Sequence, residues 1–246
     1  MKRALITGGQ QGIGLGVARA LHGAGFEVVL AAELAPEAQV VRAALTALPG
    51  ARYVRHDLAD VGGVGALLDQ VGAVTCLVSN AGVPASQRGD MMAVTPEAFD
   101  FVMDINLRGA FFLAQEVARR MLATEASAYR SLLFVTSVSA SMVSVERSEY
   151  CLSKAAAAMM AQLFALRLAP HGIGVYDLRP GIIETAMTAG VREKYDALIA
   201  GGLVPAGRWG RPADVGAAVV PLALGQMGFA TGAVIPLDGG LSIPRL

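Results

Sequence analysis

Short apolar runs alternate with longer stretches of helical periodicity along all 246 residues of the chain. The short β-rich runs predict strands, and the longer stretches predict helices. Strands are predicted at Arg3–Thr7, Glu27–Ala31, Arg52–Arg55, Val74–Ser79, Ser131–Thr136, Gly174–Leu178 and Ala233–Pro236. Helices are predicted at Gly12–Ala24, Pro36–Leu48, Gly63–Gln70, Pro96–Ala123, Glu149–Ala169 and Pro212–Leu224.

This alternation predicts the α/β class: a single-domain, doubly wound parallel sheet of about seven strands, flanked by helices on both faces because each crossover must return over the sheet. No internal repeat, low-complexity tract or linker divides the sequence, so one domain is expected over residues 1–246. Ligands of such sheets bind beyond the carboxyl ends of the strands. Motifs directly after a strand therefore carry the most weight.

Composition excludes several classes of protein. Hydrophobic residues make up 54% of the chain and charged residues 16%, which is ample material for a large core. Twenty Lys and Arg balance twenty Asp and Glu, and this neutrality argues against a nucleic-acid or membrane-surface partner. Cys76 and Cys151 offer no disulfide framework and are expected as reduced thiols in a cytoplasmic protein. Three scattered histidines predict no metal site.

Two segments bear on targeting and membrane insertion. The first residues, MKRALITGG, enter a strand directly, and no cleavable leader is expected. The stretch from Asp214 to Asp238 carries no charge between its ends and is long enough to span a bilayer. Glycines and prolines interrupt it, so it predicts a helix, a turn and a short strand in the core.

The turn after the first predicted strand reads TGGQQGIG. A glycine-rich turn between a strand and a helix lets backbone N–H groups approach a pyrophosphate, and the helix N-terminus adds a favourable partial charge. The glycine spacing departs from the usual G-x-G-x-x-G, so the position between strand and helix is the stronger argument. The candidate dinucleotide-binding residues of this turn are Gly8, Gln10, Gln11, Gly12, Ile13 and Gly14.

The end of the second predicted strand is where a dinucleotide would place its adenosine ribose. Glu33 stands there, and a carboxylate accepts hydrogen bonds from ribose hydroxyls but repels a 2′-phosphate. No basic residue lies between Glu27 and Arg42, and the glycine-rich turn carries no arginine. NAD(H) is therefore favoured over NADP(H). A merely solvated glutamate is the alternative.

Tyr150 and Lys154 share one face of a predicted helix, because residues four positions apart lie about one turn apart. They could be an ordinary surface pair, or a core aromatic beside a lysine that reaches solvent. The third interpretation is a proton-transfer pair. A phenol ordinarily holds its proton too tightly for transfer near neutral pH, and an adjacent ammonium favours the phenolate.

With TGGQQGIG, Asn80-Ala81-Gly82 after the fourth strand and Tyr150-x-x-x-Lys154, the sequence resembles the short-chain dehydrogenase/reductase family over essentially its whole length. Members carry a serine thirteen residues before the tyrosine, which is Ser137 here; Ser139 and Ser141 are less well spaced alternatives. An asparagine of the long helix after the Asn-Ala-Gly turn is matched by Asn106. The order and placement of these motifs make the resemblance specific.

The resemblance implies a Rossmann-type fold and NAD(P)-dependent oxidoreductase activity on CH–OH groups. Tyr150 would donate the proton to a ketone that accepts hydride, and Lys154 would assist it. Ser137 would hold the substrate oxygen beside the phenol. Asn106 would bend its helix and hold a water through which protons reach Lys154.

Further dinucleotide contacts are implied by the same resemblance. Asp57 and Leu58 would bracket the adenine, and Asp57 could also cap the next helix. Thr185 would bond the nicotinamide carboxamide, or simply cap the following segment. The complete set of additional candidates is Asp57, Leu58, Asn80, Ala81, Gly82, Tyr150, Lys154, Pro180, Gly181, Ile183 and Thr185.

The substrate is less well defined. Residues 184–211 are expected to fold over it as a lid with glycine hinges, and residues 140–149 to form the opposite wall. The apolar residues expected to line these two segments are Met142, Val143, Val145, Met187, Val191, Tyr195, Leu198 and Leu203. Such a pocket suits an acyl or ring carbonyl better than a sugar.

Within the family, VPAGRWGRPADVG and TGAVIPLDGG most resemble 3-oxoacyl-[acyl-carrier-protein] reductases. Reduction of a 3-oxoacyl-type ketone or acyl thioester is therefore the main hypothesis. An NAD-dependent dehydrogenase of a small secondary alcohol or polyol is the second, and a non-catalytic dinucleotide-binding regulator the third. His171 stands where such reductases often carry a carrier-docking arginine, so an acyl carrier protein is not the favoured partner, although Arg119, Arg120 and Arg130 could receive one.

Two predicted helices carry more apolar residues than one face can bury. The residues in question are Phe101, Ile105, Phe111, Phe112, Val117, Ala155–Ala158, Met159 and Met160. Exposed apolar helix faces usually mark interfaces. The family pairs these two helices across a two-fold axis, and the resemblance therefore implies a homotetramer. The alternative is that all of these side chains face their own sheet.

Overall fold

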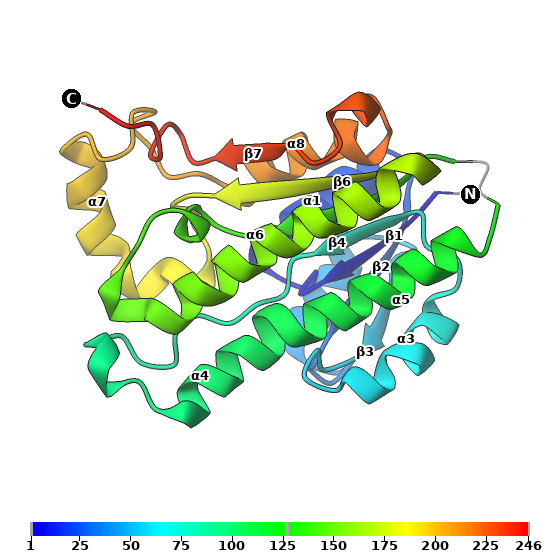
Figure 1. Cartoon of the computed structure of the whole chain (residues 1–246), viewed down its shortest axis with the longest axis horizontal. Helices are drawn as coiled ribbons and strands as arrows, with labels where there is room; N and C mark the ends of the chain where they lie inside the picture. Colours follow the sequence, from blue (N-terminus) through cyan, green and yellow to red (C-terminus); the bar gives the residue numbers. More distant parts are fainter. Residues whose placement is uncertain (1, 126–127, 246) are drawn as a thin grey trace.

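The protein, described by a computed structural model over residues 2–125 and 128–245, is an α/β domain built on seven parallel strands (Figure 1). The strands are β1 (Arg3–Thr7), β2 (Glu27–Ala32), β3 (Arg52–Arg55), β4 (Cys76–Ser79), β5 (Arg130–Val135), β6 (Ile173–Pro180) and β7 (Val234–Leu237). Their order in the sheet is β3-β2-β1-β4-β5-β6-β7. The order reverses its direction between β1 and β4, which is where ligands of doubly wound sheets bind. The predicted fold class is confirmed.

Eight α-helices of the described residues connect or follow these strands. They are α1 (Gly12–Gly23), α2 (Gln39–Ala47), α3 (Val64–Val71), α4 (Pro96–Met103), α5 (Ala110–Leu122), α6 (Ser148–Leu168), α7 (Arg192–Ala200) and α8 (Pro212–Ala223). Shorter helical turns are η1 (Val61–Gly63), η2 (Met91–Ala93), η4 (Val138–Ala140), η5 (Val145–Arg147), η6 (Ala169–His171), η7 (Ala186–Val191) and η8 (Gly228–Ala230), and η3 (Asp104–Gly109) is a π-helix.

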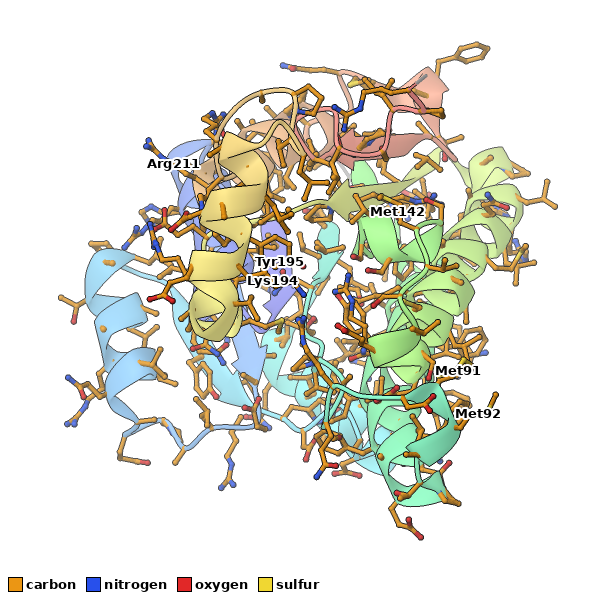
Figure 2. The ribbon with its side chains drawn as sticks, turned by 90° about the vertical axis from the view of Figure 1, so that its left-hand side faces the viewer. Met91, Met92, Met142, Lys194, Tyr195 and Arg211 are labelled. Atoms are coloured by element: carbon orange, nitrogen blue, oxygen red, sulfur yellow. The ribbon has the colours of Figure 1, made fainter. Side chains whose placement is uncertain are left out.

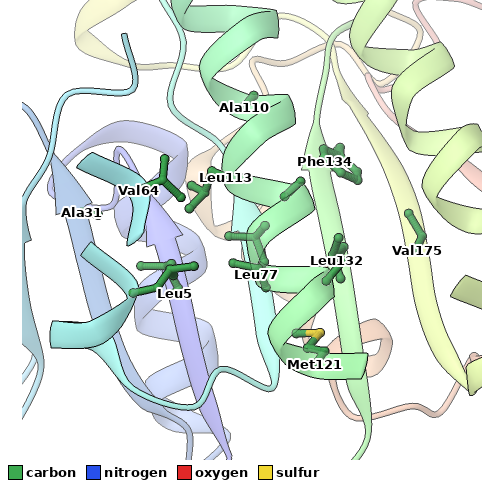
Figure 3. Packing of buried hydrophobic residues seen from close by; sticks show 14 of the residues in the cluster. Leu5, Ala31, Val64, Leu77, Ala110, Leu113, Met121, Leu132, Phe134 and Val175 are labelled. Carbon is green, nitrogen blue, oxygen red and sulfur yellow. The ribbon is translucent and has the colours of Figure 1, made fainter. Parts of the chain in front are cut away.

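Two hydrophobic clusters fill the space between the sheet and its helices, one on each face. Successive strand residues point to opposite faces, so Leu5 joins one cluster and its neighbours Ala4 and Ile6 the other. Figure 3 shows the first cluster, in which Leu5, Leu77 and Leu132 of the strands face side chains of α3 and α5. Helices α1, α2 and α8 cover the other face. Strands buried on both faces read as continuous apolar runs, which is why the sequence pattern located them.

The long helix predicted at Pro96–Ala123 is interrupted. Helix α4 begins after Thr95, whose side-chain oxygen accepts a hydrogen bond from the backbone N–H of Ala98 at 3.2 Å. Six residues of π-helix, η3, then separate α4 from α5. The predicted second helix also begins three residues late, at Gln39. Helix α7 was not predicted, because its sequence REKYDALIA is polar and buries only Ile199.

The uncharged stretch between Asp214 and Asp238 forms helix α8, the turn η8 and strand β7, as predicted. Its assignment to the core is only partly right, because β7 alternates between exposed and half-buried positions at the edge of the sheet and Phe229 is fully exposed. Among the described residues, only the helical run Val145–His171 is long and apolar enough to cross a membrane. That run contains α6, which packs along β6, and 44% of its most apolar window is buried. A core helix of a globular domain passes the same test, so the run is assigned to the core.

Candidate active site

The candidate residues gather at the carboxyl ends of the strands, which Figure 2 views head-on. In that view α7, with Lys194 and Tyr195, lies to the left of the centre, and Met142, Met91 and Met92 lie on the right. Strands β1, β4, β5 and β6 all end at this edge, and each is followed by one of the predicted motifs. The parallel sheet therefore brings together segments that lie far apart in the sequence.

The glycine-rich turn between β1 and α1 depends on the absence of side chains. Gly8 and Gly12 have backbone φ angles of 63° and 52°, in the left-handed region that favours glycine. A Cβ atom at Gly14 would lie 2.2 Å from the carbonyl oxygen of Gly8. The side chain of Gln11, the N-cap residue of α1, makes no capping hydrogen bond, so the first backbone N–H groups of the helix can bind a ligand.

The other residues of this turn differ in their burial. Gln10 is buried, and its side-chain oxygen has no hydrogen-bond partner among the described residues. Gln11 is exposed at the start of α1, and Ile13 packs partly against the core. A buried amide oxygen without a partner normally costs free energy, so Gln10 is the residue of this turn that most needs a donor.

Asn80 braces the turn through Thr7. The Asn80 side-chain amide donates to the carbonyl oxygens of Thr7 at 2.9 Å and Gly8 at 3.4 Å. The Thr7 hydroxyl in turn accepts from the backbone N–H groups of Asn80 and Ala81, both at 3.0 Å. These bonds fix the ends of β1 and β4 relative to each other. Thr7 was not selected from the sequence, although its place at the end of β1 in the same motif would have permitted it.

Tyr150 and Lys154 meet on α6 as their spacing predicted. The Lys154 nitrogen lies 5.7 Å from the centre of the Tyr150 ring and donates to the backbone oxygen of Val135 at 3.2 Å. Lys154 is buried and Tyr150 is half-buried. The pair is therefore not a solvated surface pair, and the lysine does not reach into bulk solvent.

Asn106 lies in the π-helix η3, so the expected distortion of its helix is present. Its side-chain oxygen accepts from the backbone N–H of Val83 at 2.8 Å, and its amide nitrogen donates to the Val83 carbonyl at 3.0 Å. The same nitrogen donates to the Ser153 hydroxyl at 3.1 Å, and that hydroxyl donates to the carbonyl of Tyr150 at 2.8 Å. Asn106 thus ties the segment after β4 to α6. Ser153 was missed by sequence reasoning, because a serine inside a helix carries no distinctive signal.

Gly82 allows the side chains of Asn106 and Lys154 to approach each other. A Cβ atom there would lie 3.0 Å from the Asn106 side-chain oxygen and 3.5 Å from the Lys154 nitrogen. The third residue of the Asn-Ala-Gly turn therefore marks the place where Lys154 and Asn106 converge.

Gly82→Ala is expected to lower kcat while leaving the fold intact. The methyl group must push aside Asn106, and it also contacts the Lys154 nitrogen. A loss of about ten- to a hundredfold is expected, because small displacements of catalytic groups are costly. Gly65→Ala is the matched control, since a Cβ atom there meets nothing within 4 Å. Unchanged steady-state kinetics in Gly82→Ala would contradict the prediction.

Ser137 follows β5 in an extended conformation and is buried. Its hydroxyl accepts from the backbone N–H of Ser139 at 3.0 Å, and the turn η4 that it precedes packs against α6. The two alternatives occupy other environments: Ser139 is buried with no hydroxyl partner among the described residues, and Ser141 is exposed. Ser137 is thus held at the end of its strand by the start of η4.

Glu33 is exposed directly after β2. The structure adds a cation that the linear sequence did not reveal: Arg55, at the end of β3, donates from Nε to the backbone oxygen of Glu33 at 2.9 Å. Tyr53, two residues earlier, donates to the carbonyls of Ala32 at 2.9 Å and Leu34 at 2.7 Å. Burial, followed by the charge of Glu33, raises the pKa of Tyr53 to about 12. The candidate ribose position therefore has both a carboxylate and a guanidinium nearby.

The segment after β3 holds Asp57 and Leu58. Asp57 is exposed and accepts from the backbone N–H of Ala59 at 2.9 Å, whereas Asp60 caps the turn η1. The alternative role of Asp57 as the cap of the next helix is therefore taken by Asp60. Leu58 is buried in the first cluster, and its carbonyl oxygen lies against Gly109, where a Cβ atom would approach to 2.0 Å.

His56, between Arg55 and Asp57, makes stability depend on pH. Burial lowers the pKa of His56, against the opposing charges of Asp60 and Asp57. Because the unfolded chain binds this proton near pH 6.5 and the folded chain more weakly, stability is lost as pH falls below about 6.5. We expect the urea midpoint to fall between about pH 7.5 and pH 5.5. The decrease should be smaller in His56→Gln, and an equal decrease in both proteins would contradict this assignment.

The segment after β6 carries the remaining candidates. The Gly181 N–H donates to the Leu237 carbonyl at 3.1 Å, and Ile183, three residues after Pro180, is buried. Thr185 is the N-cap of η7, in a reciprocal pair with Thr188, so its capping alternative is present. A Cβ atom at Gly12 would lie 3.4 Å from the Thr185 methyl group, which places Thr185 beside the glycine-rich turn.

Residues 184–211 form a folded unit of η7, α7 and the chain that follows. The Trp209 ring nitrogen donates to Asp196 at 2.6 Å, and its ring meets Tyr195 edge-on at 5.9 Å. Gly202 and Gly207 have positive φ angles of 86° and 65°. Of the apolar cover expected here, Met187 and Leu198 are exposed, and the other members are half-buried. Val143 and Val145 in the opposite segment are exposed rather than turned inward. A pocket between β6, β7 and residues 204–210 is lined by Ile183 and Asp238 among others, but not by Ser137, Tyr150 or Lys154.

Comparison with known proteins places the chain in a family. Residues 8–242 match the family model described as Enoyl-(Acyl carrier protein) reductase, and the chain belongs to the short-chain dehydrogenase/reductase family. It is 32% identical over 243 residues to L-xylulose reductase from Mesocricetus auratus, covering 98% of this chain and 97% of that protein. It is 34% identical over 248 residues to 3-oxoacyl-[acyl-carrier-protein] reductase MabA from Mycobacterium bovis, covering 98% and 93%.

The fold and connectivity are also those of a solved structure. A 3-oxoacyl-[acyl-carrier protein] reductase from Brucella melitensis, crystallised in complex with NAD, superposes with a TM-score of 0.92 at 48% identity. The superposition covers 100% of this chain and 98% of the other. The resemblance inferred from the motifs is therefore confirmed at the level of the family.

Proposed function

We propose that this chain is an NAD(P)-dependent oxidoreductase that reduces a 3-oxoacyl-type ketone to a secondary alcohol, with Tyr150 as the proton donor. The observation that carries the proposal is the convergence of Lys154 and Asn106 at Gly82, with the Lys154 nitrogen 5.7 Å from the Tyr150 ring. A regulator that only bound a dinucleotide would not need this buried amine beside a phenol. The similarity to 3-oxoacyl-[acyl-carrier-protein] reductases supports the same reaction.

Each candidate catalytic residue has a role that follows from its chemistry. The dinucleotide, when bound, supplies a hydride to the substrate carbonyl carbon. Tyr150 donates its proton to the carbonyl oxygen, and the Lys154 ammonium stabilises the phenolate that remains. Ser137 positions the same oxygen as a neutral donor. Asn106 acts through its bonds to Val83 and Ser153, which hold the chain around Lys154 in place.

The residues around the glycine-rich turn fit a dinucleotide. The positive φ angles of Gly8 and Gly12, the missing Cβ at Gly14 and the uncapped helix α1 leave backbone N–H groups free for a pyrophosphate. The unpartnered side-chain oxygen of Gln10 is an acceptor, and it fits a ribose hydroxyl of the same dinucleotide. The residues proposed to hold the dinucleotide are Gly8, Gln10, Gln11, Gly12, Ile13, Gly14, Glu33, Asp57, Leu58, Asn80, Ala81, Gly82, Tyr150, Lys154, Pro180, Gly181, Ile183 and Thr185.

NAD(H) is the proposed dinucleotide. Glu33 is exposed after β2 and can accept hydrogen bonds from ribose hydroxyls, whereas a 2′-phosphate would meet its charge. Arg55 reduces this discrimination, because its Nε bonds to the Glu33 carbonyl and places a cation nearby. The preference is therefore expected to be moderate. A higher kcat/KM with NADPH than with NADH would overturn it.

Residues 184–211 are proposed to close over the substrate. Gly202 and Gly207, with their positive φ angles, are the proposed hinges. The unit is attached to the rest of the chain through a small cluster of Ile199, Val204 and Leu241. Movement of this unit would bring its exposed apolar side chains towards the substrate.

A homotetramer is the proposed assembly. Exposed apolar side chains gather along α4, α5 and α6, whereas Val117 and Met160 are buried in the chain's own core. The exposed residues are Phe99, Phe101, Phe112, Leu152, Met159, Leu163 and Leu166. A second exposed group, Met227, Phe229 and Val234, lies at and beside the edge strand β7. Two such patches are what a pair of interfaces requires. Light scattering that gave a monomer mass would contradict the assembly.

The arginines considered for carrier docking are already engaged. Arg120 pairs with Asp69 at 2.8 Å and Glu116 at 3.0 Å, and Arg119 also pairs with Glu116. Arg130 donates to backbone carbonyls. A substrate without a carrier protein is therefore the favoured partner. Buried Cys76 and the free thiol of Cys151 agree with action in the cytoplasm.

Loss of reduced dinucleotide, followed across a panel of substrates, tests the proposal. The panel contains simple diketones, acyl thioesters and ketoses, each with NADH and with NADPH, and the matching alcohols with the oxidised forms. Turnover of 3-oxoacyl compounds is expected. Preferential turnover of ketoses or polyols would favour the second function, which the similarity to L-xylulose reductase supports. Dinucleotide binding without any turnover would overturn the enzymatic proposal.

A further inference from the structure

Tyr150 has a second cation against its ring besides Lys154. Arg147, the last residue of η5, lies just before α6, and its guanidinium carbon is 5.7 Å from the centre of the Tyr150 ring. The Lys154 nitrogen lies at the same distance. Lys154 is buried and bonded to Val135, whereas Arg147 is only half-buried. The phenol is therefore flanked by one internal cation and one that a molecule from solvent can reach.

The Arg147 side chain has no ion-pair or hydrogen-bond partner within residues 2–125 and 128–245. Two more exposed arginines of the chain do have one: Arg192 is paired with Glu184, and Arg208 with Asp214. A guanidinium that loses hydration without gaining an anion is costly, and five N–H donors remain available on it. Arg147 therefore has the properties of a binding group.

The acidic residues nearest to Arg147 in the sequence do not pair with it, so its guanidinium can bind a ligand. Glu146 is exposed, and its backbone oxygen accepts from the N–H of Gly89 at 3.1 Å. That bond joins the loop that carries exposed Arg88 to the residue before Arg147, so a further positive charge lies near Arg147. Glu149 is buried beneath the start of α6 and accepts from the Ser148 hydroxyl at 3.4 Å. None of these carboxylates lies within ion-pair distance of Arg147.

We propose that Arg147 binds the carboxylate of a small oxo acid whose ketone is reduced at Tyr150. This inference rests on the proposed function and names its substrate class. A guanidinium matches a carboxylate in a bidentate pair. Because the Arg147 guanidinium lies against the Tyr150 ring, a carboxylate on the arginine and a carbonyl at the phenol can be only a few bonds apart. A short-chain 3-oxo acid meets this requirement without a carrier.

In this arrangement the carboxylate is unchanged by the reaction. The ketone carbon accepts hydride, its oxygen accepts the Tyr150 proton, and the acid group only orients the molecule. Arg147 thus selects the substrate, and the transferring groups remain those already proposed. A purely orienting contact of Arg147 with the Tyr150 ring is the competing explanation, and it predicts equal effects on charged and neutral ketones.

The test compares 3-oxobutanoate with its neutral ethyl ester in the wild type, Arg147→Gln and Arg147→Lys. In Arg147→Gln, the KM for the acid is expected to rise about 10- to 100-fold, as for loss of one charge-assisted hydrogen-bonded pair. The KM for the ester should stay within about twofold of wild type, so the ratio of the two KM values isolates the carboxylate pair from any effect of the charge on Tyr150. Arg147→Lys should recover part of the affinity for the acid. Calorimetry with butanoate, which cannot react, should show the same order of binding.

Arg19→Gln is the matched control, because Arg19 is an exposed arginine on α1, on the opposite face of the sheet. It should leave both substrates unaffected. Equal losses for acid and ester in Arg147→Gln, or no loss for the acid, would overturn the inference. Turnover of the ester by the wild type reports on the proposed function separately, so a failure of one idea is distinguishable from a failure of the other.

Discussion

Tyr150→Phe is expected to reduce kcat by about 10²- to 10⁴-fold, the usual contribution of a positioned general acid. The change removes one oxygen and keeps the ring between Lys154 and Arg147. The Tyr150 hydroxyl has no hydrogen-bond partner among the described residues, so its loss breaks no internal contact. Dinucleotide affinity, measured by fluorescence titration, and the unfolding midpoint should therefore remain close to wild type.

Tyr129→Phe is the control for this variant. It also removes a phenol oxygen, one that lies 3.0 Å from the Tyr176 hydroxyl beside the opposite end of the sheet. Its expected effect is at most about 1 kcal/mol of stability, with turnover unchanged. Substantial turnover by Tyr150→Phe would exclude Tyr150 as the proton donor and would direct attention to Ser137.

Lys154→Met is expected to lower both turnover and dinucleotide affinity. Methionine has a similar length and suits a buried site, so the volume is kept and the charge is lost. Without the ammonium, the phenolate left by proton transfer is no longer stabilised, and kcat should fall about 10²-fold or more. Removal of a charged donor should also weaken dinucleotide binding about tenfold.

Lys154→Met and Tyr150→Phe are expected to differ in their affinity for the dinucleotide. Lys154→Met should weaken the dinucleotide Kd, whereas Tyr150→Phe should leave it nearly unchanged. The unfolding free energy of Lys154→Met should change by about 1 kcal/mol, because the bond to the Val135 oxygen and the contact with the Tyr150 ring are lost. A normal Kd and kcat in Lys154→Met would show that the buried amine has a structural role only.

The sequence predicted the strands well, because strands buried on both faces read as apolar runs. The prediction of helices and of core residues failed where the apolar pattern was ambiguous. Helix α7 was not predicted because its sequence is polar. The run Pro96–Ala123 is predicted as one helix because a π-helix leaves the apolar periodicity almost unchanged. Core assignment also failed for Phe229 and the exposed positions of β7, because composition cannot tell an apolar core from an apolar surface.

In the candidate site, too, some residues could be located from the sequence and others could not. The spacing between Ser137, Tyr150 and Lys154 is local information, and the helix period alone places the last two on one face. Glu33 was also found from its place after a strand. Its neighbour Arg55 was not, because it comes from the adjacent strand, twenty-two residues later in the chain. Cofactor preference was therefore inferred from one of two opposing charges.

The sequence by itself determined the order of the strands along the chain, the glycine-rich turn and the helix face shared by Tyr150 and Lys154, because each depends on residues close together in the chain. Only the tertiary structure decided which distant groups meet them. Three features depend on how strands align and helices pack: the bond from the Asn80 N–H to Thr7, the link from Asn106 through Ser153 to α6, and the contact of Arg147 with the Tyr150 ring in place of an ion pair among the described residues. Contacts of this kind are set by packing over the whole domain, and no local pattern records them.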